Sequence, residues 1–117
     1  MYHKIMIVDD SKVSRMILKK TISEITSDVT IIEASNADEA VEKLSSEEIE
    51  AAILDFHMPG LNGLDLAEKL INLQPALVIT MLTANIQNEI KDRAKALNIG
   101  YLAKPVNKAK IETFIMG

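Results

Sequence analysis

Short apolar runs alternate with longer amphipathic stretches along this chain. The runs are rich in aliphatic or β-branched residues, and they lie at Lys4–Val8, Val29–Ala34, Ala51–Leu54, Leu77–Leu82 and Tyr101–Ala103. Nearly continuous apolar character over so few residues is typical of strands buried on both faces of a parallel sheet. The pattern therefore predicts five strands.

A stretch with helical periodicity follows each run. The five expected helices extend from Ser11, from Asn36, over Leu64–Leu73, over Asn85–Asn98 and from Asn107. Glu39 stands three residues after Asn36, as in a capping box. The apolar positions of the first helix are Val13, Met16, Ile17 and Ile22. In the last helix we expect three apolar residues to face inward, namely Ile111, Phe114 and Ile115.

This alternation predicts an α/β fold, a doubly wound parallel sheet of five strands with helices on both faces. No internal repeat, linker or low-complexity tract interrupts it. Residues 1–117 are therefore expected to form one domain.

Polar residues directly follow four of the five strands. They are Asp9 and Asp10, Asp55, Thr83 and Lys104. In an open parallel sheet, ligands bind outside the carboxyl ends of the strands, where the strand order reverses. The second strand lacks such a residue, which fits an edge position and the order 2-1-3-4-5. That order brings the three carboxylates together.

Three carboxylates in one pocket repel one another. At about 4 Å and an effective dielectric of about 20, each like pair costs roughly 4 kcal/mol. A divalent cation relieves this repulsion, and an all-oxygen site favours Mg²⁺, with Mn²⁺ as an alternative. Lys104 and Thr83 add a positive charge and a hydroxyl donor, both suited to phosphoryl oxygens. Together these groups are typical of aspartyl-phosphate chemistry.

Each of these residues also has a simpler interpretation when taken alone. An acidic pair after a strand often caps a helix, and a threonine such as Thr83 does the same. Asp55 fits a turn, and a single Lys104 fits a solvated surface. Their occurrence together at one edge of the sheet favours the functional site.

Composition excludes several other classes of protein. The 117 residues are 48% hydrophobic and 26% charged, with a formal net charge of −4, and nucleic-acid binding normally needs a basic surface. The absence of cysteine excludes disulfide scaffolds and thiolate chemistry, and two histidines exclude a His-rich metal site. No apolar run approaches the roughly 20 residues of a membrane span, and no secretory signal is visible. We therefore expect a cytoplasmic location without contact to membrane.

Four segments resemble the receiver domain of bacterial response regulators, a flavodoxin-like fold whose chemotaxis members have the 2-1-3-4-5 order. These segments are Ile7–Ser11, Leu54–Gly63, Leu82–Ala84 and Tyr101–Pro105. The resemblance implies that Asp55 accepts a phosphoryl group from the phosphohistidine of a sensor kinase or phosphotransfer protein. It further implies that Mg²⁺ is held by Asp10 directly, by Asp9 through water, and by the backbone carbonyl of His57.

The resemblance also implies how the phosphoryl group is bound and sensed. Thr83, Lys104 and the amide of Ala84 bind its oxygens, and Tyr101 turns inward as Thr83 moves toward the group. This changes an output face on the fourth helix, fifth strand and fifth helix that recognises a downstream protein. Four residues of the fourth helix belong to that face, namely Ile86, Glu89, Ile90 and Arg93.

The resemblance implies two further features, and the chain departs from the family pattern in a third. The side chains of His57 and Asn85 would tune the lifetime of the aspartyl phosphate. The Lys104–Pro105 bond would be cis. The last helix, which reaches only to Gly117, is shorter than usual in the family, so we expect it to be truncated or naturally short. The chain has no DNA-binding segment of its own.

Two other functions fit part of this pattern. A phosphatase of the haloacid dehalogenase type also uses an aspartate nucleophile, a Ser/Thr and a Lys, but it needs an Asp-x-Asp motif on its nucleophile strand. Here the adjacent Asp9–Asp10 pair follows a different strand. A phosphorylation-independent interaction module is the other alternative, although such modules commonly lose one of the site residues. We expect a signalling phosphoacceptor that turns over no separate substrate.

Overall fold

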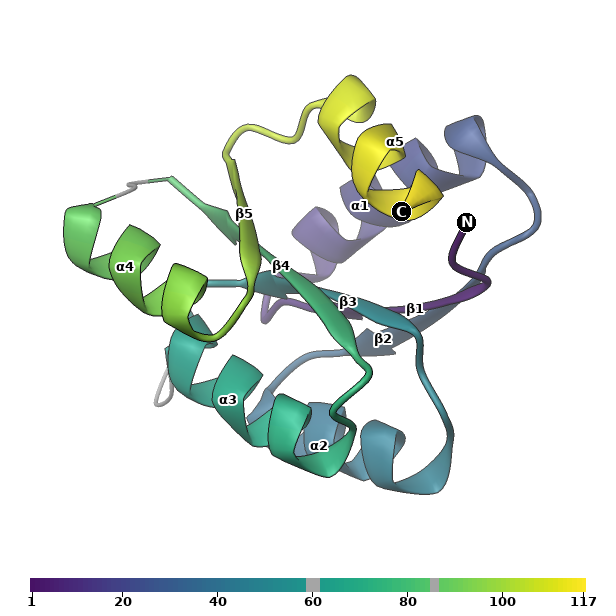
Figure 1. Ribbon diagram of the computed structural model, residues 1–117. Helices are drawn as coiled ribbons and strands as arrows, with labels where there is room; N and C mark the ends of the chain where they lie inside the picture. Colours follow the sequence, from purple (N-terminus) through teal and green to yellow (C-terminus); the bar gives the residue numbers. More distant parts are fainter. Residues whose placement is uncertain (59–61, 85–86) are drawn as a thin grey trace.

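A five-stranded parallel sheet runs through the centre of the molecule, between two layers of helices (Figure 1). The computed structural model describes residues 1–58, 62–84 and 87–117. The strands are β1 (Lys4–Val8), β2 (Thr30–Ala34), β3 (Ala51–Asp55), β4 (Val78–Thr83) and β5 (Gly100–Ala103). The helices are α1 (Lys12–Ile25), α2 (Ala37–Ser46), α3 (Gly63–Leu73), α4 (Asn88–Ala96) and α5 (Lys108–Met116). The strand order is β2-β1-β3-β4-β5, so the predicted order is confirmed.

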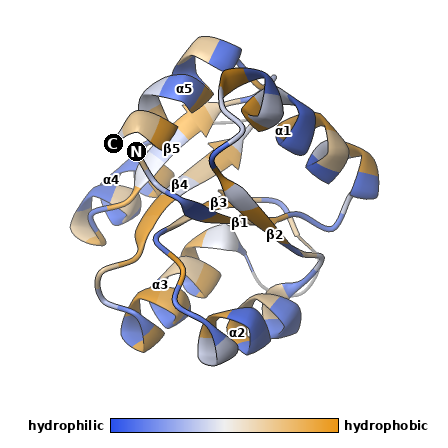
Figure 2. Cartoon of the chain, turned by 90° about the vertical axis from the view of Figure 1, so that its right-hand side faces the viewer, coloured by the Kyte–Doolittle hydropathy of each residue, from blue (hydrophilic) through white to orange (hydrophobic). Residues whose placement is uncertain are grey.

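Alternate residues of each strand serve two separate cores. On β1, Ile5 and Ile7 pack with α1 and α5, whereas Met6 and Val8 face the layer formed by α2, α3 and α4. The four side chains are fully buried. The strands lie between the two helical layers (Figure 2). This two-sided burial is the physical reason why β1 and β3 are nearly continuous apolar runs.

Side-chain caps fix where several helices begin. Ser11, Asn36, Asn62 and Asn107 each accept a hydrogen bond from the backbone N–H three residues later. The capping residue predicted for α2 is thus confirmed, but Glu39 reaches back to Ser35 rather than to Asn36. The Ser11 cap matters most for function because it starts α1 directly after the Asp9–Asp10 pair.

The first helix buries a different face from the one its apolar residues indicated. Its buried residues are Leu18 and Ile22, while Val13, Met16 and Ile17 are 65%, 57% and 49% exposed. The apolar positions located the helix correctly, but only Ile22 among them belongs to the core. A cluster of apolar side chains therefore lies on the surface of α1.

The fourth helix is shorter than the sequence pattern indicated. It ends at Ala96, and Asn98 adopts a left-handed conformation with φ 58°, the usual backbone of a residue just past a helix end. The expected start at Asn85 lies outside the described residues. Within the described ranges, every helix is too short or too polar to cross a membrane.

The last helix is anchored although it is short. Ile111 and Ile115 are buried as expected, and Phe114 is half-buried with its ring 5.7 Å from that of Tyr2. The Tyr2 N–H donates to the carbonyl of Ile115 at 3.0 Å, so the two ends of the described chain are joined. The Lys104–Pro105 bond before this helix is cis.

Candidate functional site

The strand register brings the polar residues of four strand ends to one edge of the sheet. Val8 of β1 pairs with Leu54 of β3, so Asp9 emerges beside Asp55. Asp55 in turn pairs with Leu82 of β4, which places Thr83 one position further along. Thr83 pairs with Ala103 of β5, and Lys104 follows directly.

The three carboxylates form a tight acidic cluster at this edge. One oxygen each from Asp9, Asp10 and Asp55 lies within 4.8 Å of the others. Asp9 and Asp55 are only 2% and 5% exposed, whereas Asp10 faces solvent. The clustering supplies oxygen ligands of the kind that Mg²⁺ prefers.

Burial and neighbouring negative charges shift the pKa of Asp9, the buried residue of the Asp9–Asp10 pair. Burial raises the pKa of Asp9 above its usual value, and the neighbouring charges of Asp55 and Asp10 add to this rise. The N–H of Ser11, which donates to Asp9 Oδ1 at 2.9 Å, and the charge of Lys104 oppose it. Burial and like charge both disfavour the ionised form of Asp9, and a divalent cation bound here would favour it.

Lys104 supplies the positive charge that contacts the cluster. Its Nζ lies 2.8 Å from Asp55 Oδ1, and its backbone N–H donates to the Thr83 carbonyl at 2.9 Å. The His57 N–H also donates to Asp55 Oδ1, at 3.2 Å. The carboxylate of Asp55 is therefore oriented from β5 and from its own loop.

Close packing shapes the loop after Asp55. The N–H of Phe56 donates to the Leu82 carbonyl at 2.9 Å, and the N–H of Gly63 donates to the Phe56 carbonyl at 3.1 Å. A Cβ on Gly63 would lie 2.9 Å from Phe56 Cα and 3.1 Å from the Asp55 carbonyl oxygen. Only glycine allows α3 to begin this close to the site.

The remaining residues singled out in the sequence lie around the pocket or away from it. Thr83 is fully buried, Ala84 is exposed, and the exposed ring of His57 stands edge-on to Phe56, with ring centroids 4.9 Å apart. Tyr101 is 37% exposed on the edge strand β5.

Two residues named in the sequence analysis lie outside the described residues. They are Asn85, which was expected to tune the phosphoryl lifetime, and Ile86 of the expected output face.

The expected output face is partly engaged inside the molecule. Glu89 is exposed, but Ile90 packs against the core. Arg93 of α4 forms ion pairs with Asp65 and Glu68 of α3. Arg93 is therefore tied to a neighbouring helix in this structure.

Sequence reasoning missed one residue that touches the site. Arg15 Nη1 donates to the carbonyl oxygen of Asp9 at 2.6 Å. The signal available was a basic residue on the first turns of the helix that follows the acidic pair. Arg15 Nε also donates to Glu33 Oε1 on β2 at 3.1 Å. Glu33 is distant in sequence, so the position of the Arg15 side chain could not be inferred without the fold.

The carboxylates meet at the switch point between β1 and β3, and the threonine and lysine stand at the carboxyl ends of the neighbouring strands, which is the edge where open parallel α/β sheets bind ligands. The sequence profile of the response regulator receiver domain matches residues 5–116. The chain therefore belongs to this family, whose members are the phosphoacceptor domains of two-component signalling.

Relatives include both whole proteins and parts of larger ones. The chain is 32% identical over 120 residues to the chemotaxis protein CheY1 of Helicobacter pylori, with 96% of each chain covered. It is 29% identical over 113 residues to the sensory/regulatory protein RpfC of Xanthomonas campestris, where 92% of this chain spans 15% of that protein. A CheY-like receiver domain protein of Methanospirillum hungatei superposes with a TM-score of 0.88 at 25% identity, over 99% of this chain and 92% of that one.

Proposed function

We propose that Asp55 is the phosphoacceptor of this receiver domain and takes its phosphoryl group from the phosphohistidine of a sensor kinase or a phosphotransfer protein. The observation that carries the proposal is the 2.8 Å contact between Lys104 Nζ and Asp55 Oδ1 beside two further carboxylates. An aspartate that only caps a helix or ends a strand does not require a lysine and two further carboxylates beside it. Residues 1–117 act as one phosphoacceptor unit in the cytoplasm.

The side chains have distinct parts in the transfer. An oxygen of Asp55 forms the new O–P bond while the N–P bond of the donor breaks, and the electron pair of that bond stays on the donor's imidazole nitrogen. The Lys104 ammonium group neutralises charge on the transferred phosphoryl oxygens, and the hydroxyl of Thr83 and the amide of Ala84 donate hydrogen bonds to them. Positioning and charge neutralisation account for most of the catalysis in this kind of reaction.

The acidic cluster fits a magnesium site. Asp9, Asp10 and Asp55, with the backbone carbonyl of His57, would hold Mg²⁺, and Mn²⁺ would take the same oxygen ligands. The bound ion supplies positive charge for the phosphoryl oxygens. Asp9 is buried and already accepts a hydrogen bond from the Ser11 N–H, while Asp10 is exposed. This difference supports Asp10 as a direct ligand and Asp9 as a ligand through water.

A protein donor would approach along a groove beside the site. Asp9 and Lys104 line this groove together with Ile17 and Pro105, which come from α1 and from the segment between β5 and α5. The exposed apolar side chains of α1, which include Val13 and Met16, extend the surface away from the pocket. Contact with a protein donor here would bring its phosphohistidine to Asp55.

Phosphorylation would be read through β4 and β5. Thr83 is buried at the end of β4, and Tyr101 stands partly exposed on β5, opposite Met81 in register. A shift of Thr83 toward the phosphoryl group would open space for Tyr101 to turn inward. The surface of α4, β5 and α5 would then present a changed shape to a downstream protein, and His57 and Asn85 would set how long that state lasts.

The test uses a small phosphodonor with Mg²⁺. Wild-type protein should gain one phosphoryl group in an acid-stable, base-labile adduct, and Asp55→Asn should gain none. An undiminished adduct on Asp55→Asn, or none on wild type, would contradict the proposal. Sustained hydrolysis of varied phosphomonoesters would favour a phosphatase, and target binding that ignores the phosphodonor would favour an interaction module.

A separate substitution tests whether the groove beside the site binds the protein donor. Ile17→Asp should slow phosphotransfer from a protein donor while leaving labelling by the small phosphodonor unchanged, because it alters the groove and not the reacting groups. Equal loss with both donors would point to damage in the pocket instead.

A further inference from the structure

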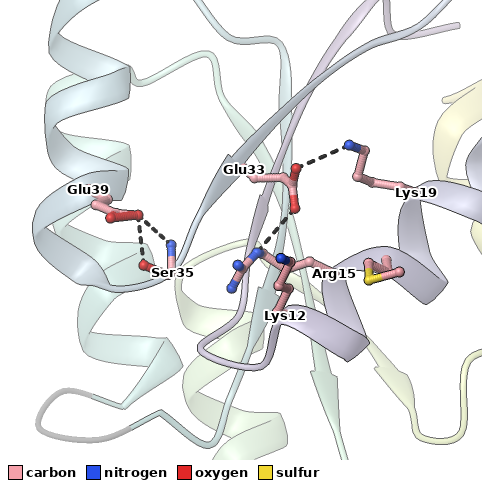
Figure 3. A pocket seen from close by; sticks show the side chains of 7 residues that line it. Lys12, Arg15, Lys19, Glu33, Ser35 and Glu39 are labelled. Carbon is pink, nitrogen blue, oxygen red and sulfur yellow. Dashed lines mark hydrogen bonds and ion pairs between the residues drawn. The ribbon is translucent and has the colours of Figure 1, made fainter.

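One guanidinium group links the acidic site to the edge strand of the sheet. Arg15 Nη1 donates to the Asp9 carbonyl oxygen at 2.6 Å, and Arg15 Nε donates to Glu33 Oε1 at 3.1 Å. The side chain is only 14% exposed. Figure 3 shows Arg15 of α1 reaching toward Glu33, with Lys19 contacting the same carboxylate from the next turn.

Glu33 holds the guanidinium in place from β2. It stands opposite Ile7 in the register of β1 and β2, close to the point where β1 ends. A hydrogen bond from Lys19 lowers the pKa of Glu33, and the hydrogen bond from Arg15 lowers it further. The carboxylate is therefore ionised at neutral pH and accepts charge-assisted hydrogen bonds from Arg15 Nε and Lys19 Nζ.

The atom that Arg15 contacts belongs to the peptide between the two acidic residues. This peptide is planar, so holding its oxygen also fixes the direction of the Asp10 N–H and the placement of both Cα atoms. Asp9 is further held by its N–H, which donates to the Ala34 carbonyl at 3.1 Å. Among the described residues the carboxylate of Asp10 has no hydrogen-bond partner, so its direction depends on this backbone.

We propose that Arg15 is a positioning residue for the metal site: by bridging Glu33 and the Asp9 carbonyl, it sets the orientation of Asp9 relative to Asp10. The inference rests on the proposed Mg²⁺ site. A lysine at this position keeps the charge, but its three N–H donors share one nitrogen on a flexible stem, so it lacks the two separate donor nitrogens that the guanidinium holds in one plane. Geometry, rather than charge, is what Arg15 contributes.

The experiment measures Mg²⁺ binding to the full chain by titration calorimetry. Arg15→Met and Arg15→Lys should both raise the Kd by roughly 10-fold, the scale seen when hydrogen bonds that orient metal ligands are lost. Lys19→Met is the matched control, because it removes a cation from the same Glu33 carboxylate without touching Asp9. Its Kd should stay near the wild-type value.

A second readout separates positioning from general stability. In the metal-free protein, Arg15→Lys should shift the backbone amide resonances of Asp9, Asp10 and Ser11 while those of β3 and β4 stay in place. If Arg15→Met fails to fold, Glu33→Gln serves instead. It keeps the bond to Asp9 but weakens the anchor, so it should raise the Kd by less than Arg15→Lys does.

The outcomes distinguish this inference from the proposed function. Wild-type protein that binds no Mg²⁺ would overturn both. Wild-type binding with an unchanged Kd in Arg15→Lys would overturn only the positioning role, since charge alone would then suffice. Equal weakening by Lys19→Met and Arg15→Met would also overturn it.

Discussion

Lys104 Nζ lies 2.8 Å from Asp55 Oδ1, and this ion pair joins the end of β5 to the end of β3. The carboxylate side chain is 6% exposed and the lysine side chain 33% exposed. The Lys104 ammonium group thus faces a cluster of three carboxylates. The pair has two opposed consequences, because a charge that attracts phosphoryl oxygens also repels a metal ion.

Replacing Lys104 with methionine should separate these two effects. Lys104→Met should bind Mg²⁺ more tightly than wild type, since a positive charge near the ligands is gone. It should react with a small phosphodonor about 100-fold more slowly, the usual loss when one donor to a developing charge is removed. Calorimetry and the rate of adduct formation measure the two quantities.

Lys108→Met is the matched control for this experiment. Lys108 is a nearby exposed lysine whose partner is Glu24 at 3.5 Å, outside the pocket. The Lys108→Met substitution should leave both the Mg²⁺ affinity and the rate of adduct formation unchanged. Weaker Mg²⁺ binding in Lys104→Met would contradict the assignment of Lys104 as the charge that opposes the metal.

Gly63→Ala should destabilise the protein although alanine favours helices. The new Cβ would lie 2.9 Å from Phe56 Cα and 3.3 Å from Met81 Sδ, so the loop after Asp55 must move. Overpacking of this kind costs about 1–3 kcal/mol, against a gain of about 1 kcal/mol in helix propensity. Urea unfolding measures the net loss.

Gly100→Ala provides the comparison for that substitution. Its nearest atom would be Thr80 Oγ1 at 3.4 Å, an ordinary contact on the edge strand. We expect a change within about 0.5 kcal/mol. Equal effects at the two glycines would show that the close approach at Gly63 is unimportant.

The fold was largely predictable because its signals are local. Apolar runs such as Ile5–Val8 and Ala51–Leu54 reveal strands buried on both faces, and an Asn36 cap reveals where a helix begins. The buried face of α1 was not predictable from spacing alone. Val13, Met16 and Ile17 are apolar residues like Leu18, and only the packing against α5 and the sheet decides which of them is covered.

The site was predictable to the extent that the register of a parallel sheet determines it. Asp9 and Lys104 directly follow β1 and β5, and Asp55 is the last residue of β3, so the strand order brings them together. Contacts made through long side chains were not predictable. Arg15 reaches the Asp9 carbonyl oxygen just after β1 and the Glu33 carboxylate on β2, and Arg93 crosses from α4 to α3.

Asp10 should be needed for stabilisation by Mg²⁺ but not for folding. Its side chain is exposed, so Asp10→Asn should unfold near the wild-type urea midpoint in the presence of a chelator. At ten times the wild-type Kd, Mg²⁺ should stabilise wild type by about 1.4 kcal/mol, and the variant by much less. An equal gain in both proteins would place the ion somewhere other than the acidic cluster.

Glu39 should contribute to stability at neutral pH and lose that contribution in acid. The N–H and hydroxyl of Ser35 both donate to its carboxylate at 2.8 Å and hold its pKa below the usual value of 4.5. An acid with a lowered folded-state pKa stabilises the protein above its unfolded pKa, and this stability disappears as the pH falls through the folded value. Wild type should therefore exceed Glu39→Gln in urea midpoint at pH 7, and the difference should close in acid below the folded-state pKa. Glu42→Gln removes the same charge from an exposed position on the same helix and serves as the control. An equal difference in urea midpoint from wild type, with the same pH dependence, would mean that the Ser35 hydrogen bonds are not the cause.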